Sequence, residues 1–156
     1  MSPCVNAVRI ACLLGPLLPA GTAQAQIATV NHASVQIVTG DRGKDEATPL
    51  TITVANASGR IFERVWRTRQ VIKPYSTFNL WLQRTRAETA EKLQGSRITF
   101  RLDPKGDDHW DVKEARLTVT GEHGTRLTWH WGPFALDAQR GKPVAVEFAL
   151  TDDHRQ

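Results

Sequence analysis

Short segments in which apolar and polar residues alternate one by one constrain this chain more than any other feature. In the clearest of them, Leu50, Ile52 and Val54 alternate with Thr51 and Thr53. Such alternation is typical of a β-strand with one buried and one solvated face. Similar segments, separated by turn residues, lie at 35–38, 50–54, 61–66, 78–82, 98–102, 110–119, 127–131 and 144–150. The sequence therefore predicts an all-β fold, an eight-stranded antiparallel β-sandwich, with a closed barrel as the alternative.

The segment 110–119 changes phase part-way along. Trp110 and Val112 share one phase, whereas Ala115, Leu117 and Val119 share the other. A one-residue slip keeps both groups on the same face only if the strand carries an extra residue. We therefore expect a β-bulge at 113–114.

One short helical turn is expected in the chain beyond residue 25. Thr85 and Glu88 have the spacing of a capping box, and residues 88–94 are good helix formers that end at Gly95. The sequence therefore predicts a helix or helical turn over 88–94.

Residues 1–25 have the layout of a secretory signal peptide. Arg9 precedes the apolar run 10–18, and Ala23 and Ala25 form an A-x-A site before Gln26. The run is too short to cross a membrane, so we expect cleavage and no transmembrane segment in the mature chain. Cleavage leaves 131 of the 156 residues, one domain over 26–156, and removes both cysteines, at positions 4 and 12. The protein is then secreted or periplasmic.

The charge of the chain is mildly basic. Lysine and arginine number 20 against 16 acidic residues, and the signal peptide contains one of these charges, Arg9, so the mature net charge falls from +4 to +3. This balance weakly favours acidic partners such as lipid head groups or anionic polysaccharide. It lacks the concentrated basic face of a nucleic-acid-binding protein, so no nucleic-acid partner is expected.

Catalytic motifs are missing from the sequence. It contains no G-x-S-x-G elbow, no H-E-x-x-H, no Walker loop and no dinucleotide fingerprint. His130 is the one histidine inside a predicted strand, and it could pair with Glu122 or Asp111 as a general base. We expect no enzyme and no catalytic residue, with a small secreted hydrolase, or an inhibitor of one, as the alternative.

The stretch 60–86 is rich in cations interleaved with aromatic residues, and Glu63 is its single acidic residue. Such a mixture can bind anionic groups while its aromatic rings meet acyl chains or sugar faces. The candidate binding residues are Arg60, Arg64, Trp66, Arg67, Arg69, Lys73, Tyr75 and Trp81. The alternative is the ordinary solvated face of a strand.

Tryptophans also occur outside this stretch. Trp129 and Trp131 share a phase with Leu127, so they are expected in the core rather than in a carbohydrate-stacking platform. Trp110 is expected to anchor the turn that precedes it to the core.

An acidic turn precedes Trp110. Carboxylates clustered on turns suit calcium, which takes six to eight oxygen ligands. The candidate metal ligands are Asp41, Asp107, Asp108 and Asp111, provided that the loop 39–46 approaches 107–111. The alternative is a solvated turn, and calcium is the one cofactor that the sequence suggests.

The order of these features resembles the PLAT, or lipoxygenase-homology, β-sandwich, especially the PLAT-like modules of secreted bacterial proteins. The resemblance is carried by a first strand ending in Thr39-Gly40-Asp41, the strand 98–102 and the turn 106–112. It implies an eight-stranded sandwich that docks to lipid, membrane or protein, in some members with calcium in its end loops. The chain departs from the pattern at His109, where related modules usually have asparagine or another small polar residue, and at Asp45-Glu46, which loosely replaces the G-T-D segment that usually follows T-G-D.

Together, these observations predict an exported, non-enzymatic binding module. Its expected partner is a lipid or envelope surface, a glycan or a protein.

Overall fold

The chain folds into a sandwich of antiparallel strands. The computed structural model describes residues 28–45, 48–67, 71–104, 106–139 and 141–155. The predicted signal peptide and Arg69 lie outside these residues. The strands are β1 (Thr29–Thr39), β2 (Leu50–Asn56), β3 (Gly59–Trp66), β4 (Thr77–Arg84), β5 (Glu88–Thr89), β6 (Arg97–Leu102), β7 (Asp108–Gly121), β8 (Arg126–Trp131), β9 (Phe134–Ala138) and β10 (Val144–Ala149).

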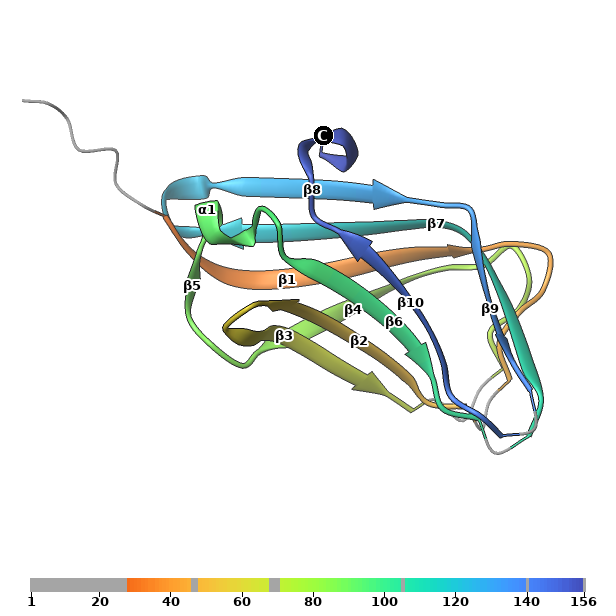
Figure 1. Ribbon diagram of the computed structural model, residues 1–156. Coiled ribbons are helices and arrows are strands. Elements are labelled where there is room, and N and C mark those ends of the chain that lie inside the picture. The colour runs from red at the N-terminus through yellow and green to blue at the C-terminus, as the bar shows by residue number, and fades with distance from the viewer. Residues whose placement is uncertain (1–27, 46–47, 68–70, 105, 140, 156) are drawn as a thin grey trace, which may run out of the picture.

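The strands form two layers with the core between them (Figure 1). One layer has the order β10-β6-β2-β3 and the other β4-β1-β7-β8, with β5 beside β1 and β9 beside β7. The layers are joined where β3 meets β4 through two residue pairs, Phe62 with Arg84 and Glu63 with Gln83. The predicted all-β sandwich is therefore confirmed.

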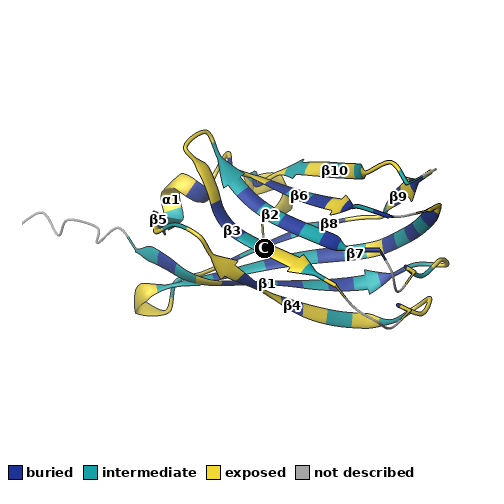
Figure 2. Cartoon of the chain, turned by 90° about the horizontal axis from the view of Figure 1, so that it is seen from below, coloured by how far each residue is buried: buried dark blue, intermediate teal, exposed yellow. Residues whose placement is uncertain are grey.

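Alternating burial along the strands matches the alternating sequence (Figure 2). Leu50, Ile52 and Val54 are fully buried, as the period-two pattern predicts. Trp110, Trp129 and Trp131 expose 0%, 2% and 4% of their surface, so the assignment of all three to the core is confirmed. Trp131 stacks against Phe148 across the sandwich, with ring centroids 5.8 Å apart.

The predicted bulge lies in β7 at Lys113. Val38 of β1 pairs with Glu114, whereas Thr39 pairs with Val112, so Lys113 is the extra residue. The bulge lets the first part of β7 pair with β9 and the second with β8. Gly132, between β8 and β9, has φ of 141°, and a Cβ atom there would lie 2.5 Å from the Lys113 carbonyl oxygen. Only glycine fits this corner, where the chain passes over the bulge.

Two local predictions need correction. The sandwich has ten strands rather than eight, because β5 and β9 form outside the predicted segments. The capping box does not form: Glu88 lies in β5, while the Thr85 hydroxyl donates to the Arg60 carbonyl oxygen. The helix α1 occupies Ala90–Leu93, shorter than the predicted turn, with Thr89 at its N-terminus. Two 3₁₀ turns, Glu122–Gly124 and Asp152–His154, complete the described elements. None of the helices among the described residues is long and apolar enough to cross a membrane.

Candidate functional site: a groove across the outer sheet face

Outward side chains of the β4-β1-β7-β8 layer line up in rows that cross the strands. In the middle row Trp81 lies opposite Ser34, Ser34 opposite Thr118, and Thr118 opposite Thr128. Directly opposed residues in a sheet point to the same face. The middle row therefore carries one large aromatic ring at β4 and short hydroxyl side chains on the other three strands.

The rows on either side carry mostly longer side chains. One consists of Asn79, Gln36, Arg116 and His130, and the other of His32, Thr120 and Arg126. Short residues between longer ones leave a trough along the middle row. Four strands at the usual spacing of about 4.8 Å make this trough about 14 Å long.

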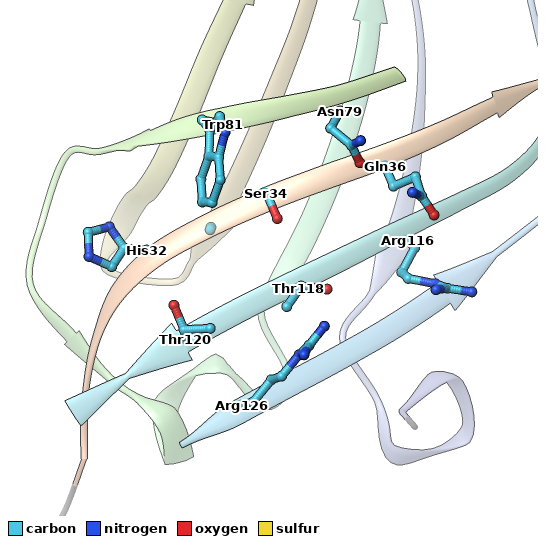
Figure 3. A pocket seen from close by; sticks show the side chains of 10 residues that line it. His32, Ser34, Gln36, Asn79, Trp81, Arg116, Thr118, Thr120 and Arg126 are labelled. Atoms are coloured by element: carbon cyan, nitrogen blue, oxygen red, sulfur yellow. The ribbon is translucent and has the colours of Figure 1, made fainter. Parts of the chain in front are cut away.

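A pocket of about 310 Å³ lies along this trough (Figure 3). Its lining consists of His32, Ala33, Ser34, Gln36, Asn79, Trp81, Arg116, Thr118, Thr120 and Arg126. We call it the outer groove. Trp81 is 69% exposed, and the described residues of the lining supply hydroxyls, amides and two arginines but no carboxylate. The outer groove can therefore stack a ring and hydrogen-bond to polar groups beside it.

The two arginines of the outer groove have different surroundings. Arg116 donates from Nη2 to Glu114 Oε1 at 3.2 Å and from Nε to His130 Nδ1 at 3.4 Å. Arg126 has no side-chain hydrogen bond or ion pair with another residue in the described part of the chain. In Figure 3 its side chain extends from β8 toward Thr118. Arg116 is held in place, whereas the guanidinium of Arg126 is available to a ligand.

The predicted binding residues of the stretch 60–86 do not share one surface. Trp66 packs inward, with its ring 4.9 Å from that of Phe78, so it belongs to the margin of the core. Arg60 is exposed but forms an ion pair with Glu63, at 2.5 Å between Nη1 and Oε1. The remaining candidates that are exposed and lie outside the outer groove are Arg64, Arg67, Lys73 and Tyr75. Of the candidates that the structure describes, Trp81 alone lines the outer groove.

Tyr75 and Asp41 lie together in another pocket, of about 510 Å³. The Tyr75 hydroxyl donates to Asp41 Oδ1 at 2.8 Å, and this hydrogen bond and the negative charge of Asp41 raise the pKa of Tyr75. Tyr75 is 72% exposed. It is thus an aromatic surface residue away from the outer groove.

The two loops of the predicted metal site do approach each other. The Gly40 amide donates to the Asp111 carbonyl oxygen at 2.7 Å, and the Asp111 amide donates to the Arg42 carbonyl oxygen at 3.1 Å. Their carboxylates do not converge, because Asp108 points into the core side of β7 whereas Asp111 points outward toward His109 and Arg42. Among the described residues, no three histidine, cysteine or acidic side chains are placed to hold a metal ion.

An ammonium group lies between these loops. Lys44 is fully buried, and its Nζ donates to the Asp45 carbonyl oxygen at 2.5 Å. Asp108 Oδ1 accepts a hydrogen bond from the Asp45 amide at 3.3 Å, while its buried Oδ2 has no partner among the described residues. Burial lowers the pKa of Lys44, and the charges of Asp108 and Asp45 partly oppose this effect. The chain therefore places its own cation near the buried aspartate.

Histidine and carboxylate side chains meet at two places. His130 Nδ1 lies 3.3 Å from Glu114 Oε1, in a pocket of about 610 Å³ that adjoins the outer groove at Arg116. The sequence suggested Glu122 or Asp111 as the partner of His130, so the observed partner is different. His109 Nε2 lies 2.7 Å from Asp111 Oδ1. No serine, threonine or cysteine lines the His130 pocket within the described residues.

Sequence reasoning missed most of the outer groove. A usable signal was present, because four solvent-facing positions between the buried residues of β1 and of the second part of β7 carry polar, uncharged side chains. The residues that this signal would have added are Ser34, Gln36, Thr118 and Thr120.

Comparisons with known proteins add little beyond the fold. No family model matches the sequence, and no curated protein matches it. The solved structures that it matches include a crystal structure of a lipoxygenase variant, at 16% identity and a TM-score of 0.45. The match covers 78% of this chain but 16% of the lipoxygenase chain. Similarity at this level carries no argument about ligand or activity.

Proposed function

We propose that the protein is an exported, non-enzymatic glycan-binding module that holds its ligand in the outer groove. The observation that carries the proposal is the combination of one exposed tryptophan ring with a trough of hydroxyl and amide side chains on a regular sheet face. A sugar ring offers an apolar C–H face for stacking and hydroxyls for hydrogen bonding. Both needs are met within one groove.

The same features favour a glycan over the other expected partners. A lipid-docking face needs a cluster of exposed apolar side chains, and Trp81 is the one large apolar residue in the groove lining. A protein partner is usually recognised over a broad surface of some 800 Å² with several aromatic anchors. Single-stranded nucleic acid is held by successive stacking aromatics, which this groove lacks.

Export and a PLAT-like fold are parts of this proposal. The segment 1–25 supports export, because it has the layout of a signal peptide. The contact between Gly40 and Asp111 supports the PLAT-like assignment, since it joins the two stretches that carry the resemblance. The assignment concerns the fold and implies no ligand.

A hydrolase is the second candidate, and the pair His130–Glu114 favours it. An imidazole beside a carboxylate can act as a general base toward water. Arg116 contacts both side chains and competes for the same acceptors, which favours a structural role for the pair. Release of reducing ends from a bound glycan by the wild type, lost in His130→Ala, would establish the hydrolase instead.

The test is affinity electrophoresis of the mature protein in gels containing dextran, xylan or polygalacturonate. At least one polymer should retard the wild type, and Trp81→Ala should weaken that binding about tenfold, as expected for loss of a stacked ring. Tyr75→Ala is the matched control, because Tyr75 is an equally exposed aromatic residue outside the groove. If no polymer retards the protein, or if both variants lose the same affinity, the proposal is wrong. Tighter binding to oligothymidylate or anionic vesicles than to every glycan would also refute it.

A further inference from the structure

We infer that the glycan held in the outer groove is acidic, and that its charged residue lies at the β7–β8 end of the groove, away from the ring stacked on Trp81. This inference rests on the function proposed above and narrows it to a class of ligand.

The charges of the groove support the acidic class. Among the described residues, Arg116 and Arg126 line it and no carboxylate does. The acid beside Arg116 is Glu114, which is engaged with Arg116 and His130. An anion in the groove would therefore meet Arg126 without competition from a protein carboxylate. Guanidinium groups bind carboxylates and sulfates through paired, charge-assisted hydrogen bonds.

The cross-strand rows separate the stacking position from the charged position. Trp81 lies on β4, whereas Arg116 lies on β7 and Arg126 on β8. These strands are two and three places from β4 in the sheet, about 10 and 14 Å away at the usual spacing. One sugar ring cannot reach both ends. The ligand is therefore an oligosaccharide with an acidic residue beyond the stacked one.

The adjoining pocket gives such a chain room to continue. Arg116 lines both the outer groove and the pocket of about 610 Å³ that contains His130 and Trp131. Lys113 also lines this second pocket, so a second cation follows Arg116, and the Glu114 carboxylate of the same lining is engaged with Arg116 and His130. The arrangement suits a polymer whose acidic groups recur along its length.

The experiment compares polygalacturonate with its methyl ester, which removes the charge and keeps the chain. The wild type should bind the free acid at least tenfold more tightly, and this preference should shrink as salt is added. Dextran sulfate and dextran form a second pair, which distinguishes sulfate from carboxylate as the source of the charge.

Arg126→Gln tests the position of the charge, with Arg64→Gln as the matched control. Both changes remove one exposed arginine, but Arg64 lies outside the groove. Arg126→Gln should lower affinity for the acidic polymer about tenfold and leave affinity for its neutral partner unchanged, since a hydrogen bond to a charged group is lost. Arg64→Gln should change neither.

The failures of the two proposals can be told apart. Equal binding of acidic and neutral polymers, still dependent on Trp81, overturns the acidic class and leaves glycan binding intact. Equal losses in Arg126→Gln and Arg64→Gln show attraction to overall charge and overturn the placement in the groove. Lack of binding to both acidic polymers overturns the acidic class, and lack of binding to xylan and to all four of these polymers overturns glycan binding as well.

Discussion

Replacing Lys44 by methionine tests whether its ammonium holds the two end loops together. Methionine keeps the length and most of the volume of the buried side chain, so the change removes the charge with little loss of packing. Two terms destabilise the variant: loss of the charge-assisted bond to the Asp45 carbonyl oxygen, and loss of the cation near the buried Asp108. Because the effect of burial on the Lys44 pKa outweighs that of the two aspartate charges, relief of the buried ammonium offsets most of the lost charge interaction. We expect a net loss of about 1 kcal/mol, from the lost hydrogen bond to the Asp45 carbonyl oxygen.

Urea unfolding of the mature domain, followed by tryptophan fluorescence, measures this loss. With a slope of about 2 kcal/mol per molar urea, the midpoint should fall by roughly 0.5 M. Lys44→Met combined with Asp108→Asn should lose clearly less than the sum of the two single variants, since the groups interact. A variant as stable as the wild type, with additive effects in the double variant, would refute the reasoning.

The pH dependence of stability gives an independent readout of Lys44. Burial holds its pKa below the ordinary value of 10.5, so over the interval up to 10.5 the unfolded chain binds a proton that the native chain has released. The free energy of unfolding should therefore rise with pH across that interval. Lys44→Met should lack this rise.

The remaining predictions concern the core, the tyrosine, the loops and processing. Trp110→Ala should lower the free energy of unfolding by about 3–5 kcal/mol in urea, because a fully buried ring is deleted. Trp110→Phe should lower it much less, since the indole Nε1 has no partner among the described residues. Equal losses in the two variants would contradict this account. Tyr75 is the one tyrosine of the chain, so tyrosinate absorbance reports its titration alone. The raised pKa of Tyr75 should fall toward the ordinary value in Asp41→Asn. An unchanged titration would argue against the hydrogen bond. The melting temperature should not respond to millimolar calcium or to a chelator, because the acidic side chains do not converge; a rise with calcium would restore the metal site. Mass spectrometry of the exported protein should give an N-terminus within a few residues of Gln26, and an intact Met1 would rule out the cleaved signal peptide.

The parts of the fold that were predictable are those in which side-chain phase alone decides the outcome. The slip between Val112 and Ala115 was enough to place the bulge of β7, because both residues had to reach the same core. The shared phase of Trp129 and Trp131 with Leu127 was enough to place both rings inside. Once a strand is recognised, burial of one of its faces determines which side chains point into the core.

Predictions failed where tertiary contacts gave residues a structure different from the one that their local sequence favours. Glu88 has the spacing of a capping residue, but Asn56 and Arg86 donate to its carboxylate, and these hydrogen bonds and nearby positive charges lower its pKa. The five residues of β9 lie between two prolines, and they form a strand because the bulge turns part of β7 toward them. Neither contact is visible in the local sequence.

The candidate site was harder to predict than the fold, because it depends on strand order. Trp81 was identified from its own neighbourhood, but its hydroxyl-bearing neighbours belong to other strands. Alternation shows which side chains face outward and does not show which strands are adjacent. The order β4-β1-β7-β8 decides which outward side chains lie side by side in a row.

Every row of the outer groove combines a residue of β1 with residues of β7 and β8, which lie far from β1 in the sequence. The groove therefore exists only while its strands keep their register. A slip of β4 by one residue would exchange Trp81 with Leu80 or Leu82, putting the indole into the core and a leucine at the end of the groove. No excised hairpin contains the middle row, so a peptide cannot reproduce the site. Ligand binding would thus act as a measure of correct strand pairing: a misregistered molecule could remain compact and still lose its affinity.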